Sequence, residues 1–394
     1  VCKTSVGDLP SYQHIRDLHR LGYLPIKIRA LPEGTRVKIG VPMLTIVNTL
    51  PEFYWVTNFI ESLMSAVIWQ GITSATIADR YKQLFVRSLK KTIGDTSFAE
   101  FMGHDFSFRG MGGLESAIMS GMAHLTSFKG TDTIPAILGL QKYYTGSQDL
   151  GFSVPATEHS VMSAGTTVEG ELETYRRLIT KIYPSGIISI VSDTYDLWKV
   201  LDEYLPSLRA EILSRDGKVV IRPDSGDPVK IICGNPEGKT KQERLGAYRL
   251  LDKHFGSTVV NGYKVLNPKI GLIYGDSITY ERAEAITNKL IELGFAPLMV
   301  YGIGSYTYQY NTRDTFGMAV KCTAIQHEGK WKKVYKDPVT DDGTKKSAVG
   351  LLSVKNGVLT DRLSEPAEHD DMQVVYENGA VYWTSIYAIR DRLA

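Results

Sequence analysis

Several short stretches place a carboxylate, a cation or an imidazole directly after a run of apolar residues. The strongest is VIRPDSGDP (220–228), in which Arg222 and Asp224 flank a proline and a glycine turn follows. Such a rigid loop could fix an anion-binding group beside a hydroxyl-binding one. The alternative interpretation is a turn in which the two side chains form an ion pair with each other.

The same pattern follows three other apolar runs: residues 187–191 precede Ser192-Asp193, 270–274 precede Gly275-Asp276-Ser277, and 297–301 precede Gly302-Ile-Gly304-Ser305. Asp193, Asp224 and Asp276 could bind ribose hydroxyls, or Mg²⁺ through water. N–H groups at Gly304 and Ser305 could hold a phosphate, although a tight strand-to-helix turn explains the same glycines. One such ending means little because turns favour Asp, Gly and Ser, but four in succession indicate an active-site rim.

Aromatic and basic side chains occur together in HDFSFRG (104–110). Phe106 and Phe108 beside Arg109 could stack on a planar ring and bind an anion, or they could be a core aromatic pair with an incidental arginine. Three cations follow downstream, Arg313, Lys321 and Lys336. Together they could neutralise a phosphate or pyrophosphate, whereas each alone fits a solvated surface charge.

Two further stretches carry polar groups without an obvious partner. In FKGTDT (128–133), Asp132 could cap the helix that follows or accept a hydrogen bond from an amide or hydroxyl. In SVPATEHS (153–160), Glu158 and His159 stand side by side. Isolated loop histidines are more often structural or exposed than catalytic. No serine or cysteine nucleophile motif surrounds His159, so an acyl-transfer triad is unsupported.

The elements that must position these residues follow a regular order from about residue 120. Short apolar runs (187–191, 218–222, 270–274, 297–301) alternate with helical patterns over 168–182, 192–205, 245–255 and 280–293. This alternation predicts a parallel sheet covered by helices, as a closed barrel or an open sheet. Earlier in the chain, strands are predicted at 24–34 and 42–49, and a helix at 73–93.

Composition limits the class of protein. The chain has 394 residues, enough for two structural units, with 43% hydrophobic and 22% charged residues. The net charge of +2 gives no global field for nucleic acid or a membrane surface, and no apolar run of membrane-spanning length is present. The cysteines, Cys2, Cys233 and Cys322, are odd in number and far apart, which predicts reduced thiols in the cytoplasm. No signal peptide is visible, although the chain opens without Met.

In combination, the motifs resemble the nicotinamide phosphoribosyltransferases, a family of type II phosphoribosyltransferases. The motifs, in the order typical of that family, are FRG, FKGTDT, SVPATEHS, VSDTYD, IRPDSGDP, GD after a strand, the glycine turn, TRD and KDPV. The earlier stretches LPEG and PEFYWVTNFIES are similar too. The resemblance extends from about residue 20 to residue 365, and its specificity lies in the combination.

The resemblance implies transfer of phosphoribosyl from phosphoribosyl pyrophosphate to nicotinamide, giving nicotinamide mononucleotide and pyrophosphate in NAD salvage. It implies Mg²⁺, ATP as co-substrate, and a head-to-tail homodimer with shared active sites. The implied fold is an irregular α/β barrel over residues 106–317. A second α+β domain is built from both chain ends, residues 1–105 and 318–394.

The resemblance also assigns roles to single residues. Phe106 stacks on the nicotinamide ring, and Asp132 accepts from the carboxamide N–H. A nicotinate carboxylate would be repelled by Asp132 and would leave it without a donor. The groups that contact the diphosphate and ribose are Arg109, Arg222, Asp224, Gly275 and Asp276. The phosphate cradle comprises Gly304, Ser305 and Arg313, with Lys321 and Lys336 nearby.

The catalytic set implied in this way is His159, Asp193, Asp224 and Glu158. His159 matches the histidine that the family phosphorylates from ATP. Glu158 assists it only if the loop turns its side chain toward the imidazole. The strand-end aspartates, Asp193 among them, hold the ribose and favour the positive charge that builds on it.

Two departures from the family pattern stand out. Ser305 occupies the place of a second glycine in the phosphate turn. About a hundred residues that precede the alignable region in the family, including an aromatic contributed across the dimer, have no counterpart here. The alternatives are a nicotinate phosphoribosyltransferase, a non-catalytic interaction protein on the same fold, and an unrelated phosphate-binding barrel such as an isomerase.

Overall fold

The computed structural model describes residues 12–146, 148–275, 277–340, 346–363 and 370–394. The chain divides into two compact units. The first unit combines residues 1–70, 143–146 and 312–394; the second unit combines 71–142 and 147–311. The second unit carries most of the predicted site residues.

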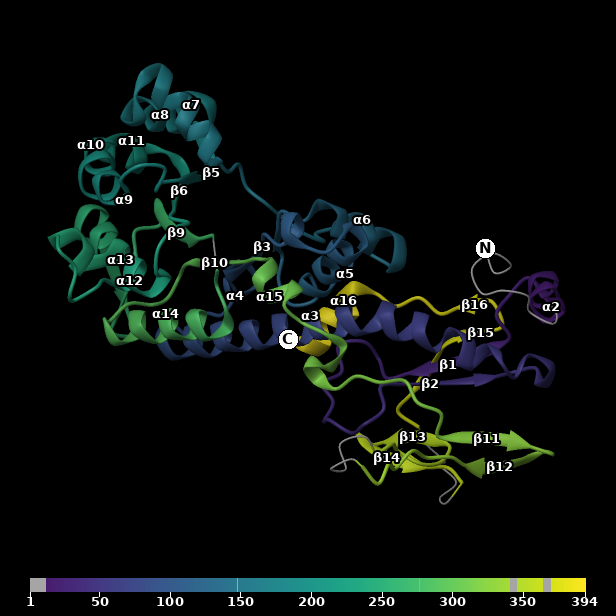
Figure 1. Ribbon diagram of the computed structural model, residues 1–394. Coiled ribbons are helices and arrows are strands. Elements are labelled where there is room, and N and C mark those ends of the chain that lie inside the picture. Colours follow the sequence, from purple (N-terminus) through teal and green to yellow (C-terminus); the bar gives the residue numbers. More distant parts are fainter. Residues whose placement is uncertain (1–11, 147, 276, 341–345, 364–369) are drawn as a thin grey trace. The chain divides into compact units, whose positions relative to one another are not determined.

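A six-stranded parallel sheet forms the centre of the second unit. Its order is β4 (Gly130–Thr131), β3 (Gly103–Asp105), β10 (Val300–Ile303), β9 (Ile270–Tyr274), β6 (Asp216–Arg222) and β5 (Ser185–Val191). The four apolar runs predicted as strands after residue 120 contribute β5, β6, β9 and β10 to this sheet, which Figure 1 shows running from β5 to β3. The fourth run begins pairing only at Val300, because Leu298 and Met299 turn tightly after Pro297, which has no N–H to donate.

The segment that contains SVPATEHS connects the two edges of this sheet. Phe152 pairs with Gly130 at the β4 edge, where the Thr131 N–H donates to the Phe152 carbonyl at 2.9 Å. Four residues later, Ala156 pairs with Ser189 at the β5 edge, where the Ser189 N–H donates to the Pro155 carbonyl at 2.9 Å. One short segment therefore bridges both edges of the curled sheet, which gives the predicted irregular α/β barrel.

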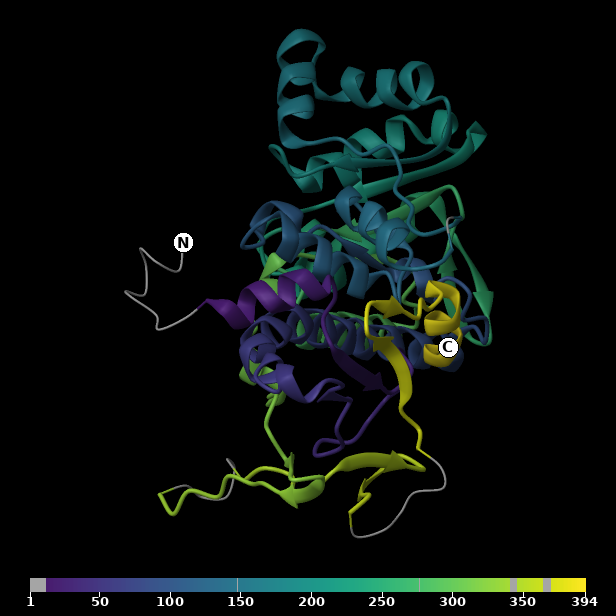
Figure 2. The same cartoon turned by 90° about the vertical axis from the view of Figure 1, so that its right-hand side faces the viewer.

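Helices cover the outer side of the sheet. Those around β5 and β6 are α7 (His159–Glu169), α8 (Glu171–Arg177), η3 (Leu178–Ile182), α9 (Leu197–Lys199), η4 (Val200–Tyr204), α10 (Leu205–Ser207) and α11 (Arg209–Ser214). Figure 1 shows α7, α8, α10 and α11 on one side of these strands, and Figure 2 shows the teal part of the chain that contains them from a second direction. Their side chains share one core with the sheet; Tyr175 and Leu201 pack with Ile188 and Ile190.

Two helices have boundaries that differ from those predicted. The helix predicted over 168–182 is interrupted at Gly170. The side chains at its two ends lie outside the core, since Val168 is 86% exposed and Ile182 is 50% exposed. The helix predicted from residue 192 begins at Leu197, because Asp196 accepts hydrogen bonds from the N–H groups of the next turn and so caps it there.

The other described elements of the second unit are α4 (Ala99–Met102), η2 (Phe108–Gly110), α5 (Leu114–His124), α6 (Ile134–Tyr143), α12 (Pro228–Cys233), α13 (Lys241–Phe255), β7 (Ser257–Val260), β8 (Tyr263–Leu266), α14 (Tyr280–Glu292) and α15 (Ser305–Gln309). The predicted helices near 245–255 and 280–293 correspond to α13 and α14. Strands β7 and β8 form an antiparallel hairpin.

Both ends of the chain build the first unit. Its antiparallel sheet has the order β16 (Ala380–Val381), β15 (Gln373–Glu377), β1 (Ile26–Ala30), β2 (Leu44–Asn48). Strand β1 therefore pairs with a strand more than 300 residues later, as the predicted second domain requires. The other elements are α2 (Gln13–Leu21), η1 (Pro51–Phe53), η5 (Arg313–Phe316), β11 (Ala324–His327), β12 (Lys330–Lys333), β13 (Leu352–Lys355), β14 (Val358–Asp361) and α16 (Ile386–Leu393).

Helix α3 (Val56–Thr92) runs from the first unit into the second. It begins 17 residues before the predicted start at 73. Residues 71–105, predicted as part of the first domain, cluster with the second unit because Tyr81, Phe85 and Leu89 are fully buried in its core. Within the described residues, no helix combines the length and the apolar character needed to cross a membrane.

Candidate functional site

All six parallel strands end at the same edge, and a predicted site residue lies at each end. Asp132 follows β4, Phe106 follows β3, Gly304 follows β10 and Gly275 follows β9; Arg222 is the last residue of β6 and Asp193 follows β5 closely. The structure thus brings together, at the carboxyl-end edge, side chains that are separated by up to about 200 positions in the sequence.

Arg222 and Asp224 form a two-pronged ion pair. Nε and Nη2 of Arg222 donate to Oδ1 and Oδ2 of Asp224 at 3.0 and 2.9 Å, and the two side chains are only 5% and 14% exposed. The alternative interpretation of this motif, an ion-paired turn, is thus what these two residues form. Gly275 lies against the pair: a Cβ there would overlap with Asp224 Oδ1 and lie 2.7 Å from Arg222 Nε. Only glycine, which has no side chain, leaves room at position 275 for the ion pair.

Phe106 lies between Arg222 and His104. The guanidinium carbon of Arg222 is 4.9 Å from the centre of the Phe106 ring, a cation–π distance. The His104 ring lies 4.6 Å away at an angle of 39°. His104 and Phe106 are two positions apart along β3 and its extension, so they share the face of the sheet opposite buried Asp105. Phe106 is half-buried, which keeps part of it available to a ligand.

Asp132 is held by two donors from other segments. His104 Nε2 lies 2.9 Å from Asp132 Oδ1, and Ser153 Oγ donates to the same oxygen at 2.5 Å. Burial acts to raise the pKa of Asp132, but the bonds from His104 and Ser153 and the charge of Arg222 outweigh it and lower the pKa below its usual value. The carboxylate, 40% exposed, is therefore ionised and fixed in direction.

His159 and Asp193 form a pair. Nε2 of His159 lies 3.2 Å from Oδ1 of Asp193, and Oδ2 accepts from the Asp224 and Ser225 N–H groups and from Ser225 Oγ at 2.6–2.8 Å. Burial acts to raise the pKa of Asp193, but these donors lower it overall. His159 is the first residue of α7 and its side chain is 46% exposed. Asp193 thus orients an accessible imidazole.

Glu158 does not join this pair in the described residues. It is exposed and precedes α7, where its carbonyl accepts from the N–H groups of Val161 and Met162. Its carboxylate makes no hydrogen bond to His159. The condition set for its catalytic role, a side chain turned toward the imidazole, is not met in this arrangement.

The turn that carries Arg109 rests on the turn that carries Ser305. Arg109 is exposed in the short helix η2, and the Gly112 N–H just beyond it donates to Gln309 Oε1 of α15 at 2.7 Å. Ser305 fills the space beside Gly110, where an added Cβ would overlap with Ser305 Oγ and lie 2.6 Å from its Cβ. Ser305 therefore packs against the FRG turn.

The structure does not describe the other four predicted residues at this edge, because three belong to the first unit and the fourth lies outside the described residues. Arg313, Lys321 and Lys336 belong to the first unit, where all three are exposed; Arg313 pairs with Asp314 and the Lys336 N–H donates to Ser347 Oγ. Asp276 lies outside the described residues. Within the described ranges, no group of three or more His, Cys, Asp or Glu side chains is arranged to hold a metal ion.

Two residues of the site carried no predicted role. His104 and Ser153 lie inside the motifs HDFSFRG and SVPATEHS, yet neither was assigned a function. The period of two along a strand could have revealed His104, since it places that residue on the same face as Phe106. No local signal marks Ser153, whose partner is 21 positions away.

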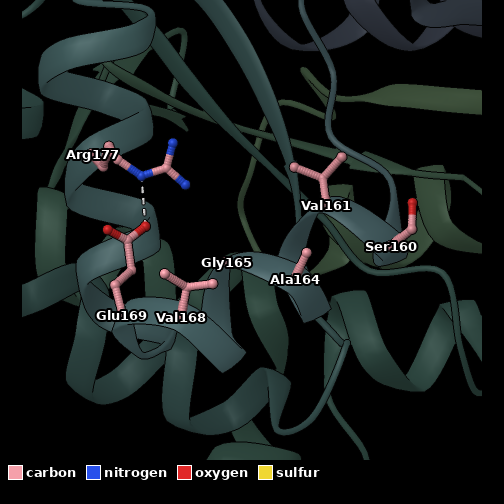
Figure 3. Close-up of a pocket in the computed structure, with 7 residues that line it drawn as sticks. All are labelled: Ser160, Val161, Ala164, Gly165, Val168, Glu169 and Arg177. Carbon is pink, nitrogen blue, oxygen red and sulfur yellow. Dashed lines mark hydrogen bonds and ion pairs between the residues drawn. The ribbon is translucent and has the colours of Figure 1, made fainter.

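A hollow of about 490 Å³ lies elsewhere, on the outer helices α7 and α8. Figure 3 shows Arg177 facing Glu169 across one end and Val161 beside Ser160 at the other. The Arg177 Nε to Glu169 Oε1 distance is 2.6 Å. The wall is mostly apolar, with Ala164 and Val168 between these ends. It contains none of the predicted site residues, so we do not place the chemistry there.

Comparison with known proteins places these features in a family. A profile of the nicotinate phosphoribosyltransferase (NAPRTase) family matches residues 101–380. A nicotinamide phosphoribosyltransferase of Acinetobacter baylyi is 53% identical over 99% of this chain and 80% of its own length. One of Mycoplasma pneumoniae is 42% identical over 84% of this chain and 72% of its own.

A solved structure has the same fold. A nicotinate-nucleotide pyrophosphorylase from Pyrococcus furiosus superposes with a TM-score of 0.56 at 16% identity, over 96% of this chain and 82% of that one. At that identity the likeness concerns the fold alone. The profile covers most of the chain and the relatives are well above 30% identical, so the chain belongs to the nicotinate phosphoribosyltransferase family.

Proposed function

We propose that this chain transfers the phosphoribosyl group of phosphoribosyl pyrophosphate to nicotinamide and releases nicotinamide mononucleotide and pyrophosphate. The observation that carries the proposal is the ionised carboxylate of Asp132, held at the strand-end edge beside Phe106. Relatives named nicotinamide phosphoribosyltransferase, at 53% and 42% identity, support it.

The base is recognised by stacking and by one hydrogen bond. Phe106 supplies an aromatic face for the pyridine ring, a contact worth about 0.5–1.5 kcal/mol. Asp132 accepts from the carboxamide N–H. The ring nitrogen of nicotinamide carries no proton, so it attacks the ribose carbon without a general base. Holding it in line supplies a large part of the rate.

The phosphoribosyl donor is held by charge. Breaking its bond to pyrophosphate builds negative charge on the leaving group, which Arg109 and Arg222 stabilise. Arg313, Lys321 and Lys336 are further candidates for phosphate contacts, and Asp224, Gly275 and Asp276 for ribose contacts. Mg²⁺, if carried by the pyrophosphate of the donor, would neutralise part of the charge on the leaving group beside Arg109 and Arg222. Within the described residues, no cluster of three or more His, Cys, Asp or Glu side chains could hold the ion without the substrate.

We further propose that ATP phosphorylates His159. The γ-phosphoryl group forms a bond to a ring nitrogen, the bond to the β-phosphate breaks, and ADP leaves. Because Nε2 faces Asp193, Nδ1 is the nitrogen open to the phosphoryl group. The 46% exposure of the side chain supports access by a nucleotide.

We propose a homodimer in the cytoplasm. Phe59, Leu63 and Val67 are 67%, 63% and 49% exposed along one side of α3, an apolar stripe that a second copy would cover. Light scattering after gel filtration tests this stoichiometry.

The cytoplasmic location is supported by the cysteines, since free thiols at Cys233 and Cys322 fit a reducing compartment.

The decisive experiment incubates the protein with phosphoribosyl pyrophosphate, Mg²⁺ and either nicotinamide or nicotinate, with and without ATP, and measures both mononucleotides. We expect a higher kcat/KM for nicotinamide, and acid-labile phosphate on His159 that His159→Ala abolishes. Preference for nicotinate would favour the second candidate, a nicotinate phosphoribosyltransferase, which the name of the family profile suggests. No product from either base, together with no binding of the mononucleotide by calorimetry, would favour a non-catalytic protein.

A further inference from the structure

Three segments of the second unit meet around one carboxylate oxygen. His104 extends from β3, Asp132 follows β4, and Ser153 precedes the segment that pairs with β5. Within the described residues, both hydrogen bonds to the Asp132 carboxylate go to Oδ1, at 2.9 Å from His104 Nε2 and 2.5 Å from Ser153 Oγ. The other oxygen, Oδ2, is left for a ligand.

The two donors restrict this carboxylate in different ways. An ionised carboxylate only accepts hydrogen bonds, so Nε2 of His104 must carry its proton, which fixes the tautomer. The imidazole is itself confined, since its side chain is 12% exposed and its ring packs 4.6 Å from the Phe106 ring. Ser153 approaches from a separate loop, so rotation of the carboxylate would break one bond or the other. A group held from two sides in this way presents its free oxygen in one direction.

We propose that His104 and Ser153 are positioning residues for base selection, which hold Asp132 so that Oδ2 accepts from a carboxamide N–H and repels a carboxylate. This inference rests on nicotinamide being the base, as in the proposed function. Neither residue touches the base in this scheme; each acts through Asp132. The lowered pKa of Asp132 supports the scheme, since a protonated acid would not exclude an anion.

The test compares Ser153→Ala, His104→Leu and His104→Gln with the unaltered protein, using nicotinamide and nicotinate as the two probes. Ser153 is exposed, so its replacement by alanine leaves the fold intact. We expect Ser153→Ala and His104→Leu to raise KM for nicotinamide about three- to tenfold with kcat within about twofold, as loss of one charge-assisted hydrogen bond implies. The nicotinamide-to-nicotinate ratio of kcat/KM falls by a similar factor.

His104→Gln serves as the rescue variant, because its amide nitrogen can take the place of Nε2 and should keep most of the selectivity. The matched controls are Ser214→Ala, which removes a hydroxyl bonded to Glu211 in α11, and His254→Leu, which removes an imidazole bonded to Asp202. Both should leave the selectivity ratio unchanged.

An equal loss for both bases, or no loss, overturns the positioning role. So does a His104→Gln variant that is no better than His104→Leu. Failure of the proposed function is recognised separately, in the unaltered protein: if it prefers nicotinate or uses neither base, both the function and this inference fall together.

Discussion

Nε2 of His159 lies 3.2 Å from Oδ1 of Asp193, and the other oxygen of that carboxylate accepts three hydrogen bonds from the Asp224–Ser225 turn. The turn that follows β6 therefore fixes the orientation of the Asp193 carboxylate independently of the imidazole. A buried acid that orients a histidine selects the tautomer and stabilises a positive charge on the ring. The phosphoryl-accepting role proposed for His159 therefore depends on Asp193 as much as on the histidine itself.

We expect Asp193→Asn to slow ATP-dependent phosphorylation of His159 by at least about tenfold, because an amide cannot accept from all the donors that hold Asp193. The measurement is transfer of labelled γ-phosphate to an acid-labile site. Asp252→Asn is the control, since it removes a carboxylate that pairs with Lys264 on the outside of the barrel. Equal labelling of Asp193→Asn and the unaltered protein would exclude the orienting role.

Asp132→Asn should relax selection against nicotinate. Removing the negative charge removes the repulsion of a carboxylate, and the asparagine amide can even donate to it, so the nicotinamide-to-nicotinate ratio of kcat/KM should fall at least about tenfold. Competition assays with both bases measure this ratio. Glu292→Gln, at the exposed end of α14, controls for the loss of one charge. An unchanged ratio would remove Asp132 from base selection.

The strand ends of the site could be predicted from the sequence, whereas their contacts could not. Continuous apolar runs mark β5, β6 and β9 because buried parallel strands need apolar side chains on both faces. Each apolar run lies next in sequence to a site residue, so the run itself predicts that Asp193, Arg222 and Gly275 lie at strand ends. The bond from Ser153 to Asp132 spans 21 positions and depends on the curl of the sheet, which no local pattern contains.

The boundary between the units could not be predicted for a similar reason. Helix α3 is continuous over 37 residues, yet its side chains belong to two cores, Val56 to one and Tyr81 to the other. Its later turns carry the buried Tyr81 and Phe85, and its earlier turns carry the exposed Phe59 and Leu63. Helical periodicity shows that a face is apolar but not which core it meets.

Gly275→Ala should abolish most activity without unfolding the protein. The added methyl group would overlap with Asp224 Oδ1 and crowd Arg222 Nε, so the ion pair must open. We expect kcat/KM to fall about a hundredfold, because a displacement of about 1 Å in a positioning group can cost that much in rate. Gly113→Ala is the matched control, because a Cβ there meets no atom within 4 Å. If Gly275→Ala retained full activity with the thermal midpoint unchanged, the packed ion pair would be irrelevant to catalysis.

Asp202 ties η4 to α13 away from the site. Its Oδ1 accepts from Lys253 and His254, both at 2.6 Å, and its Oδ2 from Gln242 at 2.9 Å. Burial acts to raise the pKa of Asp202, but these donors lower it to about 2. Since the folded-state pKa lies below the usual value, the stabilisation is complete at neutral pH and is lost as the pH falls toward about 2.

Asp202→Asn should therefore lower the free energy of unfolding by about 1–3 kcal/mol at pH 7, and by less at pH 3. Urea denaturation at both pH values measures the difference. Asp17→Asn, which removes a solvent-exposed pair with Arg20, should change stability by less than about 0.5 kcal/mol. A deficit of the same size at both pH values would show that ionisation of Asp202 is not the source of the stabilisation.

Ser305 and Gly110 should behave as a coupled pair. An alanine Cβ at Gly110 would overlap with Ser305 Oγ and lie 2.6 Å from Ser305 Cβ, and it would meet no other atom within 4 Å. Gly110→Ala alone must therefore displace the turn that carries Arg109, and we expect KM for phosphoribosyl pyrophosphate to rise about tenfold. Ser305→Gly removes both obstructing atoms, so the double variant should recover most of the lost affinity. The coupling energy from a double-mutant cycle on KM and on the thermal midpoint measures this contact, and a value near zero would show that the two turns move independently.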